Sequence, residues 1–111
     1  MNLALERCTR IASDQSPLEP GEARALLPQV DGWSVSEDCR SIWREFGFSN
    51  YYETMAFVNA IAWLAHREDH HPDLVVSYKR CEVRLSTHSI DGLSRNDFIC
   101  AAKLNALLDA N

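Results

Sequence analysis

The fold of this chain is decided around residues 66–97, which read HREDHHPDLVVSYKRCEVRLSTHSIDGLSRND. Three of the four histidines, His66, His70 and His71, fall at the end of a predicted helix. The fourth, His88, closes an alternating run that is typical of a half-buried strand. Imidazole is the side chain best suited to moving protons near neutral pH. We therefore expect a helix end and a strand end each to deliver imidazole to a functional site.

Pro72 sets the backbone in the middle of this stretch. His66 and His70 are four residues apart, so on a helix they would share one face. Proline disfavours helical angles at the residue before it. We therefore expect the helix to end at His71, with that imidazole turned away from the helix axis.

Outward from this stretch, helical and strand patterns alternate. Helix formers after Pro20, a capping-box pattern at Asn50 and Glu53, and apolar spacing after Ser94 each predict a helix. The expected helices span about 20–28, 51–70 and 94–108, and the expected strands span 33–36, 42–48, 74–78 and 81–85, the last two joined around Lys79-Arg80. The order αββαββα predicts an α+β domain with one four-stranded antiparallel sheet and its helices packed on one face.

Size and composition indicate one domain. The 111 residues are 46% hydrophobic and 24% charged, which suits a compact core. Residues 1–19 lack periodicity, so we expect a loosely ordered lead-in to a domain over 20–111. The formal net charge of −5 argues against direct nucleic acid binding. With no signal-peptide pattern, no membrane-spanning run and four dispersed cysteines, we expect a cytoplasmic protein with reduced thiols and no membrane attachment.

The spacing within residues 66–97 resembles that of pterin-4a-carbinolamine dehydratases. The positions that match the family pattern are His66, His70-His71-Pro72, Tyr78, His88 and Asp97. The predicted element order is also similar to the family fold across about residues 20–109. The resemblance implies dehydration of 4a-hydroxytetrahydropterin to quinonoid dihydropterin in tetrahydrobiopterin recycling, with no metal and no organic cofactor.

The resemblance also implies the roles of particular residues. The implied catalytic residues are His70, His71 and His88, and the implied substrate-binding residues are Asp69, His70, His71, Ser86, Thr87, His88 and Ser89. One group must protonate the departing hydroxide and another must accept the N5 proton. The sequence leaves open which histidine is acid and which is base. His66 and Leu74 depart from residues common in the family, which affects expected substrate preference and rate more than reaction type.

Alternative interpretations compete with this one. His66 and His70 could both reach zinc from a helix, but HREDH lacks the glutamate of the zinc-protease motifs, so we expect no metal site. Asp97 is expected to be the capping partner of Ser94 and not a catalyst. The alternative function is a non-catalytic binding or assembly protein, because family members also partner a transcription factor in animals. The intact histidines favour the enzyme, and the resemblance implies a homodimer or homotetramer.

Overall fold

The computed structural model describes residues 2–109. Its elements, in chain order, are η1 (Leu3–Leu5), α1 (Pro20–Leu26), η2 (Leu27–Gln29), β1 (Ser34–Val35), β2 (Ile42–Gly47), α2 (Tyr51–Glu68), β3 (Asp73–Val76), β4 (Arg80–Leu85), η3 (His88–Ile90) and α3 (Arg95–Asp109). The predicted order αββαββα is confirmed, and short 3-10 helices accompany it. Within the described residues, no helix is both long and apolar enough to cross a membrane.

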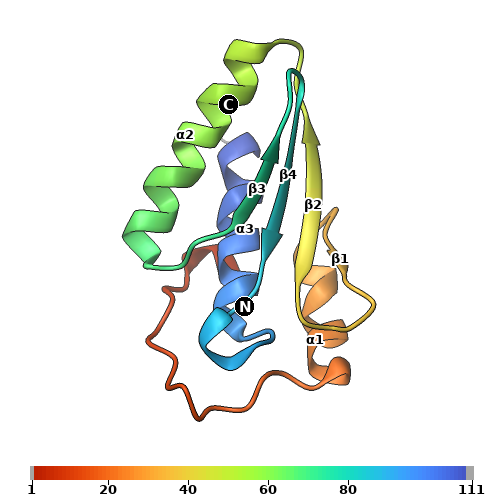
Figure 1. Cartoon of the computed structure of the whole chain (residues 1–111), viewed down its shortest axis with the longest axis vertical. Helices are drawn as coiled ribbons and strands as arrows, with labels where there is room; N and C mark the ends of the chain where they lie inside the picture. The colour runs from red at the N-terminus through yellow and green to blue at the C-terminus, as the bar shows by residue number, and fades with distance from the viewer. Residues whose placement is uncertain (1, 110–111) are drawn as a thin grey trace.

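The four strands form one antiparallel sheet in the order β1-β2-β4-β3, as predicted. β2 and β4 are central, and their register places Ile42 opposite Leu85 and Phe46 opposite Cys81. Because side chains alternate along a strand, these pairs point to the same face, and all four are buried. Figure 1 shows α2 and α3 on that side of the sheet. The helices therefore pack on one face, as the sequence pattern predicts.

α2 begins where the capping pattern predicts. The Asn50 side chain accepts the backbone N–H of Glu53 at 2.9 Å. The helix packs on the sheet through a stripe that includes Phe57 and Ile61, which are buried. Ala62, the apolar residue next to Ile61, is exposed. The buried stripe therefore follows the side of α2 that carries Phe57 and Ile61.

The prediction that Pro72 ends this helix at about residues 70–71 is wrong. The last helical residue is Glu68, and Asp69 adopts the left-handed conformation with φ 51°. A residue in that conformation closes a helix, and aspartate tolerates it better than most residues do. His70 therefore lies beyond the helix. The expected shared helical face of His66 and His70 is not formed.

The hairpin between β3 and β4 turns one residue earlier than predicted. The N–H of Ser77 donates to the carbonyl of Arg80 at 2.9 Å, so Tyr78 and Lys79 are the central turn residues. Arg80 already belongs to β4. The two strands still pair in the antiparallel register that places their alternating apolar residues on one face.

The N-terminal lead-in is held against α3. Leu3 is buried, and Lys103 on α3 donates to the carbonyl of Ala4 at 2.9 Å. Arg95 forms an ion pair with Glu6 at 2.7 Å. Polar and apolar contacts thus anchor a segment whose aperiodic sequence gave no sign of them.

Candidate active site

Two distant segments meet at one end of the sheet. β3 and β4 are antiparallel, with Asp73 opposite Arg84. Continuing that register beyond the strands brings residues 70–71 opposite residues 86–87. The chain that enters β3 and the chain that leaves β4 are therefore neighbours. The sheet pairing itself brings the histidine-rich segment to His88.

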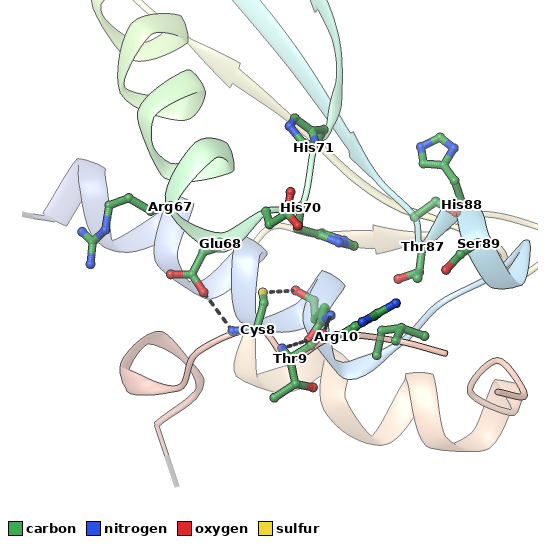
Figure 2. Close-up of a pocket in the computed structure, with 14 residues that line it drawn as sticks. Cys8, Thr9, Arg10, Arg67, Glu68, His70, His71, Thr87, His88 and Ser89 are labelled. Atoms are coloured by element: carbon green, nitrogen blue, oxygen red, sulfur yellow. Dashed lines mark hydrogen bonds between the residues drawn. The ribbon is translucent and has the colours of Figure 1, made fainter. Parts of the chain in front are cut away.

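A cavity of about 670 Å³ lies where these segments meet. Its lining includes every predicted substrate-binding residue, namely Asp69, His70, His71, Ser86, Thr87, His88 and Ser89. His71 and His88 are exposed, whereas the side chain of His70 is only 10% exposed. Figure 2 shows His70 between those two histidines and a second wall that carries Cys8 and Arg10. The structure thus gathers the predicted residues around a single cavity.

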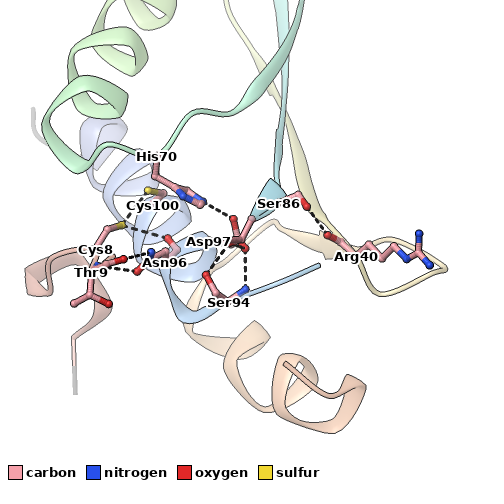
Figure 3. Close-up of polar contacts among 10 residues, drawn as sticks. Cys8, Thr9, Arg40, His70, Ser86, Ser94, Asn96, Asp97 and Cys100 are labelled. Carbon is pink, nitrogen blue, oxygen red and sulfur yellow. Dashed lines mark hydrogen bonds and ion pairs between the residues drawn. The ribbon is translucent and has the colours of Figure 1, made fainter. Parts of the chain in front are cut away.

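A buried carboxylate holds His70 in place. Nε2 of His70 lies 2.6 Å from Oδ1 of Asp97, which is fully buried (Figure 3). The other carboxylate oxygen, Oδ2, accepts the N–H of Ser94 and the hydroxyl of Thr87, both at 2.9 Å. Asp97 lies in the first turn of α3, where the helix dipole favours a negative charge. The predicted pairing with Ser94 is therefore present, and the contact with His70 is a second use of the same side chain.

Four residues of the family pattern lie outside the cavity lining, namely His66, Pro72, Tyr78 and the buried Asp97. His66 is exposed on α2, with its ring 6.0 Å from that of Trp63. Tyr78 is exposed in the hairpin turn and stacks on Tyr51, with ring centroids 6.0 Å apart and planes at 16°. Within residues 2–109, no group of three or more His, Cys, Asp or Glu residues is placed to hold a metal ion.

Part of the cavity wall was missed from the sequence. The additional lining residues are Cys8, Thr9, Arg10, Ile11, Arg67, Glu68 and Asn96. The first four belong to the aperiodic lead-in, and long-range contacts bring them here. The N–H of Cys8 donates to Glu68 at 2.8 Å, across 60 positions of sequence. Glu68 and Asn96 are polar residues on the buried faces of their helices. A polar residue at such a position needs a hydrogen-bond partner, and that need is the signal that could have indicated a covering segment.

The pKa values of Glu68 and of Cys100 are both shifted from their ordinary values. Burial raises the pKa of Glu68, but the N–H of Cys8 and the cations Lys103 and Arg7 outweigh it and hold that pKa below its ordinary value. Nε of Arg7 lies 3.0 Å from the Glu68 carboxylate. The hydrogen bond with Cys8, together with burial, raises the pKa of the Cys100 thiol, and the two sulfurs are 3.5 Å apart. At neutral pH the Glu68 of this wall is therefore ionised, and Cys100, which contacts Cys8 of the wall, is protonated.

Comparisons with known proteins identify the family of this chain. The sequence model of the family described as "Pterin 4 alpha carbinolamine dehydratase" matches residues 16–107. This chain belongs to the pterin 4-alpha-carbinolamine dehydratase family. It is 59% identical over 110 residues to a protein of Stenotrophomonas maltophilia (strain R551-3) and 51% identical over 106 residues to one of Nitrosospira multiformis, and each alignment covers 96% of this chain and 92% of the relative. The names of both relatives assign them provisionally to pterin-4-alpha-carbinolamine dehydratase.

Solved structures show the same dehydratase fold. The crystal structure of a transcriptional coactivator/pterin dehydratase from Brucella melitensis superposes with a TM-score of 0.79 at 33% identity, covering 83% of this chain and 98% of that one. A pterin dehydratase-like protein identified as a RuBisCO assembly factor shares the fold at a TM-score of 0.60 and 22% identity, covering 68% of this chain and 88% of that one. The predicted family and fold class are confirmed. By homology, the chain is a hydro-lyase of the dehydratase family.

Proposed function

We propose that this chain dehydrates 4a-hydroxytetrahydropterin to quinonoid dihydropterin by histidine general acid/base catalysis, in tetrahydrobiopterin recycling. The observation that carries the proposal is the convergence of His70, His71 and His88 on one cavity, with His70 bonded to Asp97. Family membership supports a pterin as the substrate class. Imidazoles at the cavity support acid/base chemistry as the means.

The reaction needs two proton transfers. The C4a–O bond breaks, and the hydroxyl leaves as water once its oxygen has received a proton. N5 loses its proton, and the electron pair left behind forms the N5=C4a double bond. Imidazole titrates near neutral pH, so it can donate a proton in one form and accept one in the other. Positioned groups of this kind typically accelerate such steps by about 10²- to 10⁴-fold.

The contact with Asp97 favours the base role for His70. A carboxylate 2.6 Å from Nε2 keeps a proton on that nitrogen, which leaves Nδ1 able to accept one. The same carboxylate stabilises the imidazolium that results, as in a serine-protease triad. His71 and His88 are exposed and accessible for donating a proton to the departing oxygen. We therefore assign the base to His70 and the acid to one of the other two histidines.

The remaining lining residues suit the pterin ring. The ring carries amide and amino groups that need donors and acceptors when water is displaced. Asp69 offers a carboxylate and Ser89 an exposed hydroxyl, and the segment 86–89 offers backbone groups just past the end of β4. The hydroxyls of Ser86 and Thr87 already donate to Arg40 and Asp97, so they are left to accept. We assign these residues to substrate binding.

A coupled assay with an aromatic amino acid hydroxylase tests the proposal. The purified protein should accelerate dehydration of 4a-hydroxytetrahydropterin over the spontaneous reaction, and a chelator should leave the rate unchanged. A His70→Gln protein with an unchanged melting temperature is the matched control and should lose most of the acceleration. A folded wild-type protein without acceleration would contradict the dehydratase function. That result would favour the alternative, a non-catalytic binding or assembly protein.

We also propose that the chain self-associates as a dimer or tetramer. β3 is an edge strand, and Val75 on it is 64% exposed. Trp63 on α2 and Tyr78 in the hairpin turn are exposed to a similar extent. Exposed apolar side chains beside an open sheet edge favour contacts between chains. Light scattering on a sizing column should give a multiple of the 12.6 kDa chain mass, and a monomer at micromolar concentration would contradict this.

A cytoplasmic location fits the thiols and the charge. Cys8, Cys39, Cys81 and Cys100 are all free, as in a reducing compartment. The net charge of −5 disfavours direct contact with nucleic acid. We therefore propose that the protein acts in the cytoplasm on a small pterin.

A further inference from the structure

Residues 8–11 form a fixed wall of the cavity. Asn96, which is buried, pairs with both backbone polar groups of Thr9: its side chain accepts the N–H at 3.0 Å and donates to the carbonyl at 2.7 Å. The N–H of Cys8 donates to Glu68, which is also buried. Figure 3 shows Cys8 and Thr9 bonded to side chains of α3. These part-buried hydrogen bonds fix the backbone of Cys8 and Thr9, and with it the point from which Arg10 leaves the wall.

Arg10 is the cation on this wall. It follows the anchored Thr9, is exposed, and lines the cavity. Within residues 2–109, none of the ion pairs or side-chain hydrogen bonds involves the guanidinium of Arg10. The second arginine of the lining, Arg67, extends away from the histidines in Figure 2. The donors of Arg10 are therefore available to a molecule in the cavity.

We propose that Arg10 binds the substituent on C6 of the pterin and so selects substrates whose substituent carries oxygen acceptors. The inference rests on the proposed function. C6 is bonded to N5, the atom that gives up its proton to His70 in our assignment. His70 lies between the other two histidines and the wall of residues 8–11 (Figure 2). N5 lies between C4a and C6 in the ring, so a pterin with N5 at His70 and C4a toward His71 and His88 has its C6 substituent on the side of that wall.

The chemistry of Arg10 suits an oxygen-bearing group. A guanidinium has five N–H donors and a permanent positive charge, which match hydroxyl or phosphate oxygens. A methyl group on C6 offers no acceptor, so it gains nothing from Arg10. Residues 8–11 precede residues 16–107, the part of the chain that the family model matches. The contact is thus additional to the histidine motif.

Binding of stable 7,8-dihydropterins to wild-type and Arg10→Met protein tests this. Methionine keeps most of the side-chain length and removes the charge and all donors. For a pterin with a 1,2-dihydroxypropyl group on C6, calorimetry should show Kd rising about tenfold, the size expected for one lost charged hydrogen bond. For the 6-methyl pterin, Kd should change by less than about twofold. A third pterin, whose C6 substituent carries a phosphate ester, distinguishes phosphate oxygens from hydroxyl oxygens. If Arg10→Met raises its Kd more than that of the dihydroxypropyl pterin, Arg10 binds phosphate; if the two rises are equal, Arg10 binds hydroxyl.

The matched control is Arg24→Met, which removes an exposed arginine of α1 outside the cavity lining. It should leave Kd unchanged for all three pterins. In the dehydration assay, Arg10→Met should raise KM for the dihydroxypropyl substrate and leave kcat within about twofold, because the contact forms equally in ground and transition states. The proposal would be overturned if Arg10→Met raised Kd equally for the 6-methyl and dihydroxypropyl pterins, or changed Kd for neither. It would also be overturned if the variant lowered only kcat.

The binding measurement separates this inference from the proposed function. Selective weakening by Arg10→Met in a protein without dehydratase activity would support the Arg10 contact and contradict the reaction. An active enzyme whose Arg10→Met variant shows no selectivity would contradict the contact and support the reaction. A wild-type protein that binds none of these pterins would contradict both.

Discussion

A single buried carboxylate connects the start of α3 to the candidate base. Asp97 accepts the N–H of Ser94 with one oxygen and contacts His70 with the other. The capping bond keeps the carboxylate in a fixed orientation. His70 is thereby held at one side of the cavity before substrate arrives. Orientation of this kind lowers the entropy cost of reaching the transition state.

The shared role predicts a non-additive pair of variants. His70→Gln and Asp97→Asn should each lower kcat by about 10²-fold or more, because each removes the oriented base. The double variant should be little worse than either single variant. His88→Gln should also cost more than His66→Gln, whose imidazole is exposed outside the cavity lining.

Steady-state rates and thermal melts on the same preparations measure these effects. Each variant must keep a cooperative melt, so that lost activity is not lost folding. Losses that multiply in the double variant would mean that His70 and Asp97 act separately. A folded His66→Gln protein that loses more activity than His70→Gln would contradict the assignment of roles.

At the scale of elements, the end of α2 determines where the histidines leave the helix. The N–H of Asp69 and the N–H of His70 both reach the carbonyl of Ala65, and Asp69 has the positive φ that closes the helix. Pro72 lies past this closure, just before β3. The helix is therefore ended by Asp69 and not by the proline.

This predicts different effects at the two positions. Asp69→Gly and Asp69→Ala both remove the carboxylate, but glycine adopts positive φ without strain and alanine does not. Unfolding in urea should therefore show the Ala variant to be less stable than the Gly variant by about 1 kcal/mol. Pro72→Ala should leave kcat within about threefold, since the helix already ends before it. A large loss of activity in Pro72→Ala would show that the proline, and not Asp69, controls the path of His70 and His71.

At the scale of the whole molecule, Glu68 joins the N-terminal segment to the body of the domain. Its pKa in the folded protein lies below the ordinary value of 4.5. A carboxylate with a depressed folded pKa contributes stability above its unfolded pKa, and that stability is lost as pH falls through the folded value. The anchoring of Cys8 should therefore weaken in acid below about pH 4.5.

The Glu68→Gln variant tests this link. It should unfold more easily than wild type at pH 7, and the difference should shrink as pH falls below about 4.5. Hydrogen exchange should show reduced protection of the amides of Cys8 and Thr9 in the variant, since Glu68 accepts the first of them. Glu37→Gln, in the exposed loop after β1, is the control and should change neither property. A stability difference that stays constant from pH 7 to 3 would contradict an ionised Glu68 as the anchor.

Local patterns were enough to predict the elements and part of the site. The cap at Asn50 and the alternating strands were correct because hydrogen bonds to near neighbours and burial of one face act within a few residues. The capping pair Ser94 and Asp97 was predicted for the same reason. The end of α2 was predicted too late, because Asp69 and Pro72 can each close a helix and local sequence does not distinguish which of them does.

The sequence by itself determined the order of elements, the antiparallel hairpins and the spacing that places three histidines near one sheet end. Only the tertiary structure decided that Asp97 meets His70, and that residues 8–11 complete the cavity. His70 and Asp97 are 27 positions apart in the sequence, Cys8 and Glu68 are 60 apart, and Thr9 and Asn96 are 87 apart. Each depends on how helices and lead-in pack in three dimensions, and side-chain periodicity within one segment contains no information about which distant segment will cover it.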